Sequence, residues 1–78
     1  MLYVYGPGID SIKQQVSKFG IPSIDETQFL VRSHFYITLR EILHKAGYNL
    51  QQKKTYNETE CEVYCNRGTG SVVYIEHT

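Results

Sequence analysis

The chain begins with a short run in which aliphatic residues alternate with tyrosines, and apolar residues at helical spacing follow it. Residues Leu2 to Tyr5 have a composition that favours a β-strand, and Gly6-Pro7-Gly8 then breaks the strand and turns the chain. Apolar residues recur at helical spacing from Ser11 to Phe19, which predicts a first helix there. Gly20 fits the left-handed position that ends helices, and Pro22 prevents the helix from continuing.

The middle of the chain contains the clearest helical pattern. Ser33 is a typical N-cap residue, and the apolar positions from Phe35 to Ala46 form one stripe. A second helix is therefore predicted from His34 to Ala46, and Gly47 marks its end. Residues 24–32 have no clear stripe, so both a helical turn and a short extended segment stay open for them.

The C-terminal part has the pattern of three β-strands joined by two turns. The strands are predicted at Tyr48 to Thr55, Glu60 to Asn66 and Ser71 to His77, with loops at Tyr56 to Thr59 and Gly68-Thr69-Gly70. The predicted order is β-α-(extended)-α-β-β-β. This is an α+β fold in which two helices pack on one face of a small antiparallel sheet. The partner strand of residues 2–5 stays open.

The last hairpin can be tested for internal consistency, because residues opposite each other in an antiparallel pair face the same side. A loop of three residues sets Arg67 opposite Ser71. The same register predicts one apolar, buried face, with the pairs Cys65–Val73, Val63–Ile75 and Cys61–His77. The sheet therefore has a side on which the helices can pack.

The opposite face of this hairpin is predicted to be exposed and polar, with Tyr64 facing Tyr74 and Glu62 facing Glu76. Two facing glutamates repel unless a cation lies near them. The preceding hairpin supplies that cation, because its loop brings Lys53 opposite Glu62, with Gln51 opposite Tyr64. We therefore predict a partner-binding surface on this face. It consists of Lys53, Glu62, Tyr64, Arg67, Tyr74 and Glu76.

Length and composition restrict the classes of function. A chain of 78 residues supports a single domain, 1–78, and leaves little room for a deep pocket. Eight basic side chains balance eight acidic ones, so no general attraction to nucleic acid is expected. Seven tyrosines are the outlier, and tyrosine is favoured both in strands and at binding surfaces. The sequence shows no secretion signal and no apolar run of roughly 20 residues, so we expect a cytoplasmic protein with no membrane partner.

The patterns for catalytic, cofactor and metal sites are weak, and we predict none of the three. Cys61 and His77 are predicted neighbours, and an imidazole can activate a thiol, but no third group orients the pair. Cys61 and Cys65 would lie about 13 Å apart on one strand, too far for a disulfide or a shared zinc ion, so both are interpreted as free thiols. The Gly6-Pro7-Gly8 turn lacks the motifs of a phosphate-binding loop.

The leading hypothesis is a small non-enzymatic interaction protein that binds a larger protein or nucleoprotein assembly and regulates or inhibits it. Compact chains of this size include accessory proteins of phages and mobile elements. The first alternative is a single-stranded RNA- or DNA-binding module that stacks bases on exposed tyrosines of the sheet. The second alternative is a cysteine–histidine enzyme. An unpaired sheet edge could also recruit a second copy of the chain.

Overall fold

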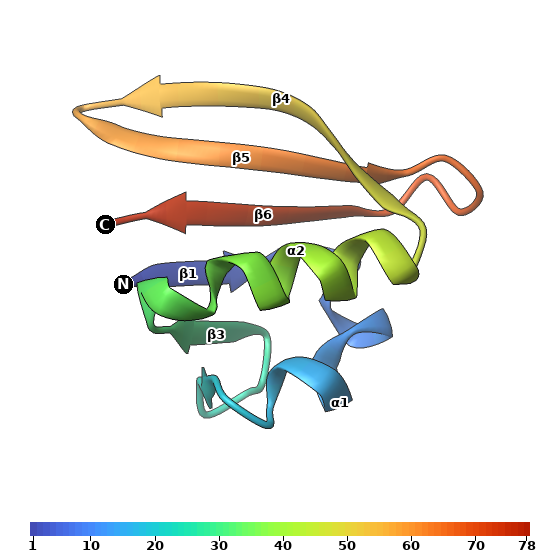
Figure 1. The fold of residues 1–78 in the computed structure, drawn as a ribbon, viewed down its shortest axis with the longest axis horizontal. Coiled ribbons are helices and arrows are strands. Elements are labelled where there is room, and N and C mark those ends of the chain that lie inside the picture. The colour runs from blue at the N-terminus through green and yellow to red at the C-terminus, as the bar shows by residue number, and fades with distance from the viewer.

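Six β-strands form one antiparallel sheet in the computed structural model, which describes residues 1–78 (Figure 1). From edge to edge the strands lie in the order β2-β3-β1-β6-β5-β4. Their bounds are Leu2–Tyr5 for β1, Ile21–Pro22 for β2, Gln28–Val31 for β3, Tyr48–Tyr56 for β4, Thr59–Asn66 for β5 and Val72–His77 for β6. The predicted α+β class and the C-terminal meander are confirmed.

Only one helix is longer than about one turn, so the prediction of two helices packed on the sheet is wrong. This helix, α2, spans Tyr36–Lys45 and follows the 3-10 turn η2 at Ser33–Phe35. The expected first helix is reduced to the 3-10 turn η1 at Ile9–Ser11 and the four-residue α1 at Lys13–Val16. None of the helices has both the length and the apolar character that crossing a lipid bilayer requires.

The first helix is interrupted at Ile12, whose φ of −122° and ψ of 0° depart from helical geometry. Ser11, at the start of the predicted helix, donates its hydroxyl to the carbonyl of Gly8 at 2.6 Å, and no side chain caps η1 or α1. Ile9, Ile12 and Val16 are nevertheless all buried. The apolar stripe is therefore real, but two short turns present it to the core.

The N-terminal strand β1 lies inside the sheet, between β3 and β6, and pairs antiparallel with both. Leu2 is opposite Val31 on one side and opposite His77 on the other. Residues 24–32, which the sequence left open, contain a loop and then β3. The edge strands are β2 and β4, and β4 carries Lys53 and Lys54, which discourage pairing with another strand.

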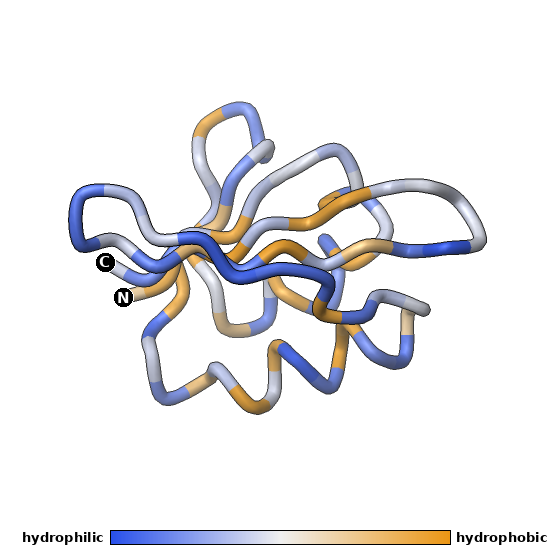
Figure 2. The backbone as a smooth tube through the Cα atoms, turned by 90° about the horizontal axis from the view of Figure 1, so that it is seen from above, coloured by the Kyte–Doolittle hydropathy of each residue, from blue (hydrophilic) through white to orange (hydrophobic).

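One side of the sheet is covered, and the other has no helix on it. Seen from above, α2 runs along one side of the strands, hydrophobic stretches lie in the middle of the molecule, and the tip of the β4–β5 hairpin is hydrophilic (Figure 2). Leu39 and Leu43 are the buried residues of α2. They belong to a single core that also contains Leu2, Val4, Ile9, Ile12, Val16, Phe29, Val31, Tyr48, Tyr64, Val73 and Ile75.

The β4–β5 hairpin turns at Asn57 and Glu58, whose φ angles of 47° and 68° are left-handed. Tyr56 pairs directly with Thr59, so the connection has two residues and not the predicted four. Positive φ at both central positions is typical of the type I′ turn, whose twist matches that of the strands. The hairpin is therefore tight although neither central residue is glycine.

The predicted register of this hairpin holds near the turn, where Lys53 lies opposite Glu62. Further along, a bulge between Leu50 and Gln52 shifts the pairing by one residue. As a result Leu50 faces Tyr64, and the predicted pairing of Gln51 with Tyr64 is wrong.

The β5–β6 hairpin has a loop of four residues, Arg67–Gly70, where three were predicted. The amide of Asn66 donates to the carbonyl of Ser71 at 2.9 Å, and the amide of Gly70 donates to the carbonyl of Asn66 at 2.7 Å. The side-chain oxygen of Asn66 accepts from the amide of Gly68 at 2.9 Å. This local bonding by an Asn side chain gives the loop its extra residue.

The longer loop changes which residues share a face. Tyr64 lies opposite Val73 and Glu62 opposite Ile75, so the predicted pairs Tyr64–Tyr74 and Glu62–Glu76 are wrong. A shift by one residue moves a whole set of side chains to the other face of the sheet. Tyr64 and Glu62 are therefore buried at 0% and 1% exposure, contrary to the predicted exposed surface. The residues expected in the core, Cys61, Val63 and Cys65, lie on the other face.

Candidate functional site

A buried carboxylate lies on the helix-covered side of the sheet. The side chain of Glu62, on β5, accepts hydrogen bonds from the hydroxyl of Tyr36 at 2.7 and 2.9 Å and from that of Tyr64 at 2.5 Å. Nε2 of His77, on β6, lies 2.8 Å from Oε2 of Glu62. We call these four residues the Glu62 cluster. A buried charge is costly unless it is hydrogen-bonded in this way.

The environment keeps Glu62 ionised. Burial raises the pKa of this carboxyl group, but the hydrogen bonds from Tyr64, Tyr36 and His77 favour the charged form. The net result is a pKa below the ordinary value of a glutamate. The two phenols respond in the opposite direction, because burial and the hydrogen bond to Glu62 raise the pKa of both Tyr36 and Tyr64. The cluster is thus a fixed negative charge held by neutral hydroxyl groups.

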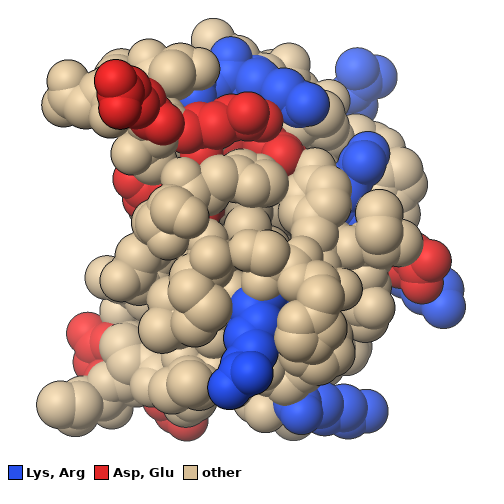
Figure 3. Space-filling view, turned by 60° about the vertical axis from the view of Figure 1, so that its left-hand side comes forward, with Lys and Arg blue, Asp and Glu red and all other residues tan.

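The outer rim of the Glu62 cluster carries further charges. Glu60 lies opposite His77 across β5 and β6, and Nζ of Lys53 lies 4.0 Å from Oε1 of Glu60. The guanidinium group of Arg40 lies 5.7 Å from the ring centroid of Tyr36. At the end of the molecule that is on the left in Figure 1, acidic and basic side chains gather at the top, and most of the remaining surface is uncharged (Figure 3).

Three groups at this end are of the types that bind metal ions. One donor atom each from Glu60, Glu62 and His77 can be chosen so that all three lie within 4.8 Å of one another. Carboxylate oxygens and imidazole nitrogens are common ligands of divalent metals. No metal site was predicted from the sequence, and the predicted register placed His77 opposite Cys61, on the other face from Glu60 and Glu62.

The side of the sheet that faces away from α2 is rich in tyrosine. Strand pairing places Tyr3, Tyr5 and Tyr74 there, because Tyr3 is opposite Glu76 and Tyr5 is opposite Tyr74. We call this side the uncovered face. Strand pairing places on it Tyr3, Tyr5, Gln28, Leu30, Asn49, Gln52, Lys54, Cys61, Val63, Cys65, Val72, Tyr74 and Glu76.

Contacts within the uncovered face order its centre. The rings of Tyr5 and Tyr74 lie with centroids 5.3 Å apart. Burial, together with the neighbouring Cys61 and Glu76, raises the pKa of Tyr5 to about 12. Tyr3 is 40% exposed and Tyr74 is half-buried, so tyrosine edges are available to a partner. The charged groups of the face are Glu76 and Lys54, which lie on either side of Cys61 across the strands.

The residues predicted to bind a partner are divided between the two sides of the sheet. Tyr74 and Glu76 lie on the uncovered face, and Arg67 is exposed in the β5–β6 loop. Lys53 is exposed, but it shares the side of Glu62. Sequence reasoning missed Tyr3 and Tyr5, although the alternation of tyrosine with Leu2 and Val4 was a visible signal. Tyr36 gave no signal, because its bond to β5 joins residues 26 positions apart.

The structure does not bring Cys61 and His77 together. Cys61 lies opposite Glu76 on the uncovered face, and His77 lies opposite Glu60 on the other side. Burial raises the pKa of the Cys61 thiol, and nearby Glu76 adds to this effect. A raised pKa disfavours the reactive thiolate. Both Cys61 and Cys65 are free thiols, as the sequence indicated.

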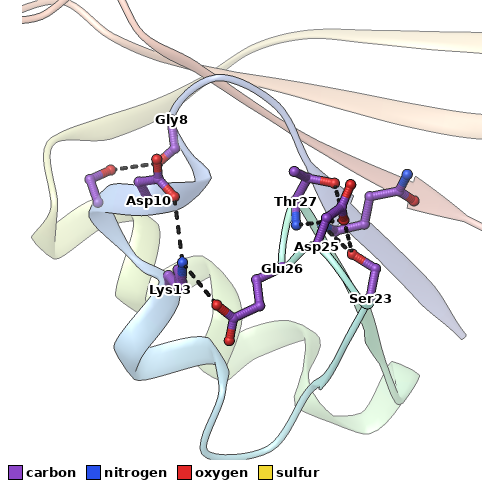
Figure 4. Close-up of polar contacts among 9 residues, drawn as sticks. Gly8, Asp10, Lys13, Ser23, Asp25, Glu26 and Thr27 are labelled. Carbon is purple, nitrogen blue, oxygen red and sulfur yellow. Dashed lines mark hydrogen bonds and ion pairs between the residues drawn. The ribbon is translucent and has the colours of Figure 1, made fainter.

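The loop between β2 and β3 is held by its own polar groups (Figure 4). Asp25 accepts hydrogen bonds from the hydroxyls of Ser23 and Thr27, both at 2.8 Å. These bonds lower the pKa of Asp25. Lys13 of α1 lies between Glu26 of this loop, at 3.3 Å, and Asp10 of η1, at 3.9 Å. The contacts tie the loop to the N-terminal turns, which gives these charges a structural role.

The Gly6-Pro7-Gly8 turn is also packed within the protein. The amide of Gly8 donates to the carbonyl of Val72 at 2.9 Å, and the hydroxyl of Tyr48 lies where a side chain at Gly8 would be. The amide is therefore not directed at a ligand. Comparison of the chain with protein-family models, with curated proteins and with solved structures gave no match.

Proposed function

We propose that this chain is a small non-enzymatic interaction protein that regulates or inhibits a larger protein by docking the uncovered face against it. The observation that carries this proposal is the asymmetry of the sheet: α2 covers one side, while three tyrosines lie on the side without a helix. Tyrosine gives a large contact area at low conformational cost and is enriched at protein interfaces.

The size of the chain is compatible with such a role. A standard interface buries about 800 Å² on each partner, which is about one sixth of the 5067 Å² surface of this chain. The uncovered face extends over the neighbouring strands β3, β1, β6, β5 and β4. One face of the sheet can therefore supply a complete interface.

The chemistry of the face favours a protein partner with an apolar centre and a basic group opposite Glu76. The centre of the face is made of tyrosine, valine and cysteine side chains, Glu76 is its one acidic group, and Lys54 is its one basic group. Nucleic acid would bring phosphates towards Glu76, and the chain as a whole has zero net charge. Base stacking on Tyr3, Tyr5 and Tyr74 is the alternative that the experiment must distinguish.

The test is affinity purification from lysate of the cells that produce the protein, with three baits. Wild type and Ile37→Ser, a change on the exposed side of α2, are expected to recover the same protein, and the double variant Tyr3→Ala/Tyr74→Ala is expected to lose it. Ile37 is a matched control because it is 62% exposed and lies on the other side of the sheet. Recovery should survive nuclease treatment and depend little on salt, because the contact buries tyrosine and releases few counterions.

Two outcomes would overturn the proposal. Recovery of only nuclease-sensitive material, with binding that weakens steeply between low and high salt, would favour single-stranded nucleic acid. A partner that is kept by Tyr3→Ala/Tyr74→Ala and lost by Ile37→Ser would move the interface to the helix side. Sedimentation of the purified chain identifies a second copy as the occupant if it forms a dimer that the tyrosine variant lacks.

A further inference from the structure

We infer that Glu60, Glu62 and His77 form a binding site for a divalent transition-metal ion of the Zn²⁺ class. The site lies on the helix-covered side of the sheet, so it is distinct from the uncovered face and goes beyond the proposed function. The two sites can be tested separately, because neither shares a residue with the other.

Strand geometry brings the three ligands together. Glu60 and Glu62 are two residues apart on β5, so both point to the same side of the sheet. His77 is opposite Glu60 on β6 and therefore points to that side as well. Two ligands from β5 and one from β6 can therefore bind one ion from the same side of the sheet. Because the loop of four residues sets this register, the site depends on the Arg67–Gly70 turn.

The distances leave room for an ion after small movements. Ligand atoms on a tetrahedral Zn²⁺ lie about 3.3–3.6 Å apart when the metal bonds are about 2.0–2.2 Å long. His77 Nε2 and Glu62 Oε2 are 2.8 Å apart, and the three donor atoms lie within 4.8 Å of one another. The imidazole must therefore move outward slightly and release the Nε2 proton that it donates to Glu62, and the Glu60 carboxylate must turn towards the ion. Both side chains are partly exposed and have space for these movements.

The tyrosines of the Glu62 cluster hold the inner ligand. The hydroxyl of Tyr64 binds Oε1 of Glu62, and that of Tyr36 lies within 2.9 Å of both oxygens. This arrangement fixes the carboxylate so that Oε2 points towards His77. Groups that orient a metal ligand in this way contribute strongly to metal affinity. Glu62 is ionised and buried, as an inner ligand should be, and a mobile surface carboxylate would lack this preorganisation.

The surroundings permit an ion to reach the site. The side chains of Glu60 and His77 are 48% and 33% exposed, so the outer half of the site is open to solvent and has space for a water ligand. Two carboxylates provide two negative charges. Lys53 is the competing cation, with Nζ 4.0 Å from Oε1 of Glu60, but such an exposed pair is weak and gives way at little cost.

The donor set selects the class of ion. Imidazole nitrogen favours Zn²⁺ and its first-row neighbours. Ca²⁺ requires six to eight oxygen ligands, and Mg²⁺ is bound mainly by carboxylates and water. A site with one imidazole and two carboxylates is therefore suited to Zn²⁺, with Co²⁺ as a spectroscopic substitute.

The experiment is a calorimetric titration of the untagged, chelator-treated chain with Zn²⁺, repeated with Co²⁺ while visible absorption is recorded. Wild type is expected to bind one ion per chain. The bound Co²⁺ is expected to show the visible absorption bands that are typical of a four- or five-coordinate ion. Glu60→Gln and His77→Asn should each weaken binding by at least about tenfold, and Tyr64→Phe by about 10- to 100-fold. Glu76→Gln is the matched control, because it removes a carboxylate next to His77 on the opposite side of the sheet.

The Zn²⁺ affinities of the remaining variants test the proposed site even if one variant is unstable. Glu60 is exposed, so Glu60→Gln is expected to fold, and circular dichroism checks this for every variant. Lys53→Gln should bind Zn²⁺ more tightly than wild type, because it removes the competing charge. The proposal is wrong if wild type binds no Zn²⁺, or if Glu60→Gln and His77→Asn bind it as tightly as Glu76→Gln.

Discussion

Nε2 of His77 lies 2.8 Å from Oε2 of Glu62, so the last strand of the chain is joined to β5 through a buried carboxylate. Tyr36 brings α2 to the same carboxylate. A helix and two strands therefore converge on one charge, which connects the helix layer with the sheet. Removal of any one partner leaves the remaining groups with unmet hydrogen bonds, and the cost of this can be measured.

The substitution Tyr36→Phe should destabilise the fold by about 1–3 kcal/mol, the usual loss when a hydrogen bond to a buried charged group is removed. Urea denaturation followed by circular dichroism measures the difference. Tyr56→Phe is the control, because Tyr56 is 61% exposed and is expected to change stability by less than about 0.5 kcal/mol. Equal stability of the two variants would show that the Tyr36–Glu62 bond contributes nothing.

Acid should weaken the metal-free protein through Glu62. Hydrogen bonds lower the pKa of Glu62 in the folded state, so its contribution to stability is complete above the pKa of an unfolded glutamate. The contribution is lost as the pH falls through the lower, folded-state pKa. Urea midpoints measured with EDTA between about pH 6 and pH 3 should therefore fall more steeply for wild type than for Glu62→Gln. Parallel curves would mean that other carboxyl groups cause the acid sensitivity.

A glycine at the tip of the β4–β5 hairpin should stabilise the protein. Glu58 has a φ of 68°, a conformation that costs a residue with a side chain about 1–2 kcal/mol and costs glycine little. Glycine also loses more conformational entropy on folding than glutamate does, which offsets part of this gain. Glu58→Gly should therefore raise the free energy of unfolding, measured by urea denaturation, by about 0.5 kcal/mol. Lys54→Gly, in the regular part of the same exposed strand, should lose about 0.5–1 kcal/mol. A loss in both variants would contradict the type I′ turn.

Gly8 is expected to tolerate no side chain because of Tyr48. A methyl group at Gly8 would overlap the Tyr48 hydroxyl, so Gly8→Ala should destabilise the fold by about 1–3 kcal/mol. The double variant Gly8→Ala/Tyr48→Phe removes the overlapping oxygen and should recover part of this loss. A double-mutant cycle from urea denaturation checks the coupling, and strictly additive effects would show that the two residues are not in contact.

The two cysteines should differ in reactivity. Cys61 is 8% exposed and its pKa is raised by burial, whereas Cys65 is half-buried. Alkylation followed by mass spectrometry should therefore modify Cys65 first, and Cys61 should react more slowly in the folded protein than in urea. Cys65→Ser isolates the signal of Cys61. Faster alkylation of Cys61 in the folded protein would revive the activated-thiol alternative.

The elements were largely predictable, because their signals are local. Leu2 to Tyr5, the helix around Leu39 and the three C-terminal strands follow from spacing and turn residues, and all of them are present. The first helix failed because Ser11 bonds to Gly8 and also lies 3.0 Å from the hydroxyl of Tyr48, a residue from a distant strand. The spacing of Ile9, Ile12 and Val16 still identified buried positions, since burial follows the apolar pattern even where a regular helix does not form.

The candidate sites were less predictable, because they depend on one loop. The sequence predicted that Tyr74 and Glu76 share a face with Tyr64 and Glu62, whereas the structure places them with Tyr3 and Tyr5. The sequence predicted a loop of three residues at Gly68-Thr69-Gly70, and hairpin loops of four residues are also common. The side chain of Asn66 favours the loop of four residues, because its oxygen accepts hydrogen bonds from the amides of Gly68 and Thr69. This loop length placed Glu62 and Tyr64 on the helix-covered side of the sheet and Cys61 on the uncovered face.

The sequence by itself determined the class of fold, the meander of β4, β5 and β6, and the concentration of tyrosine in strands. These properties depend on residues that are close together in the chain. Tertiary structure decided that β1 lies inside the sheet, that Tyr3 and Tyr5 join Tyr74 on one face, and that Tyr36 and His77 meet Glu62. These relationships join residues far apart in the chain, and only the packing of α2 and the strand register bring their side chains together.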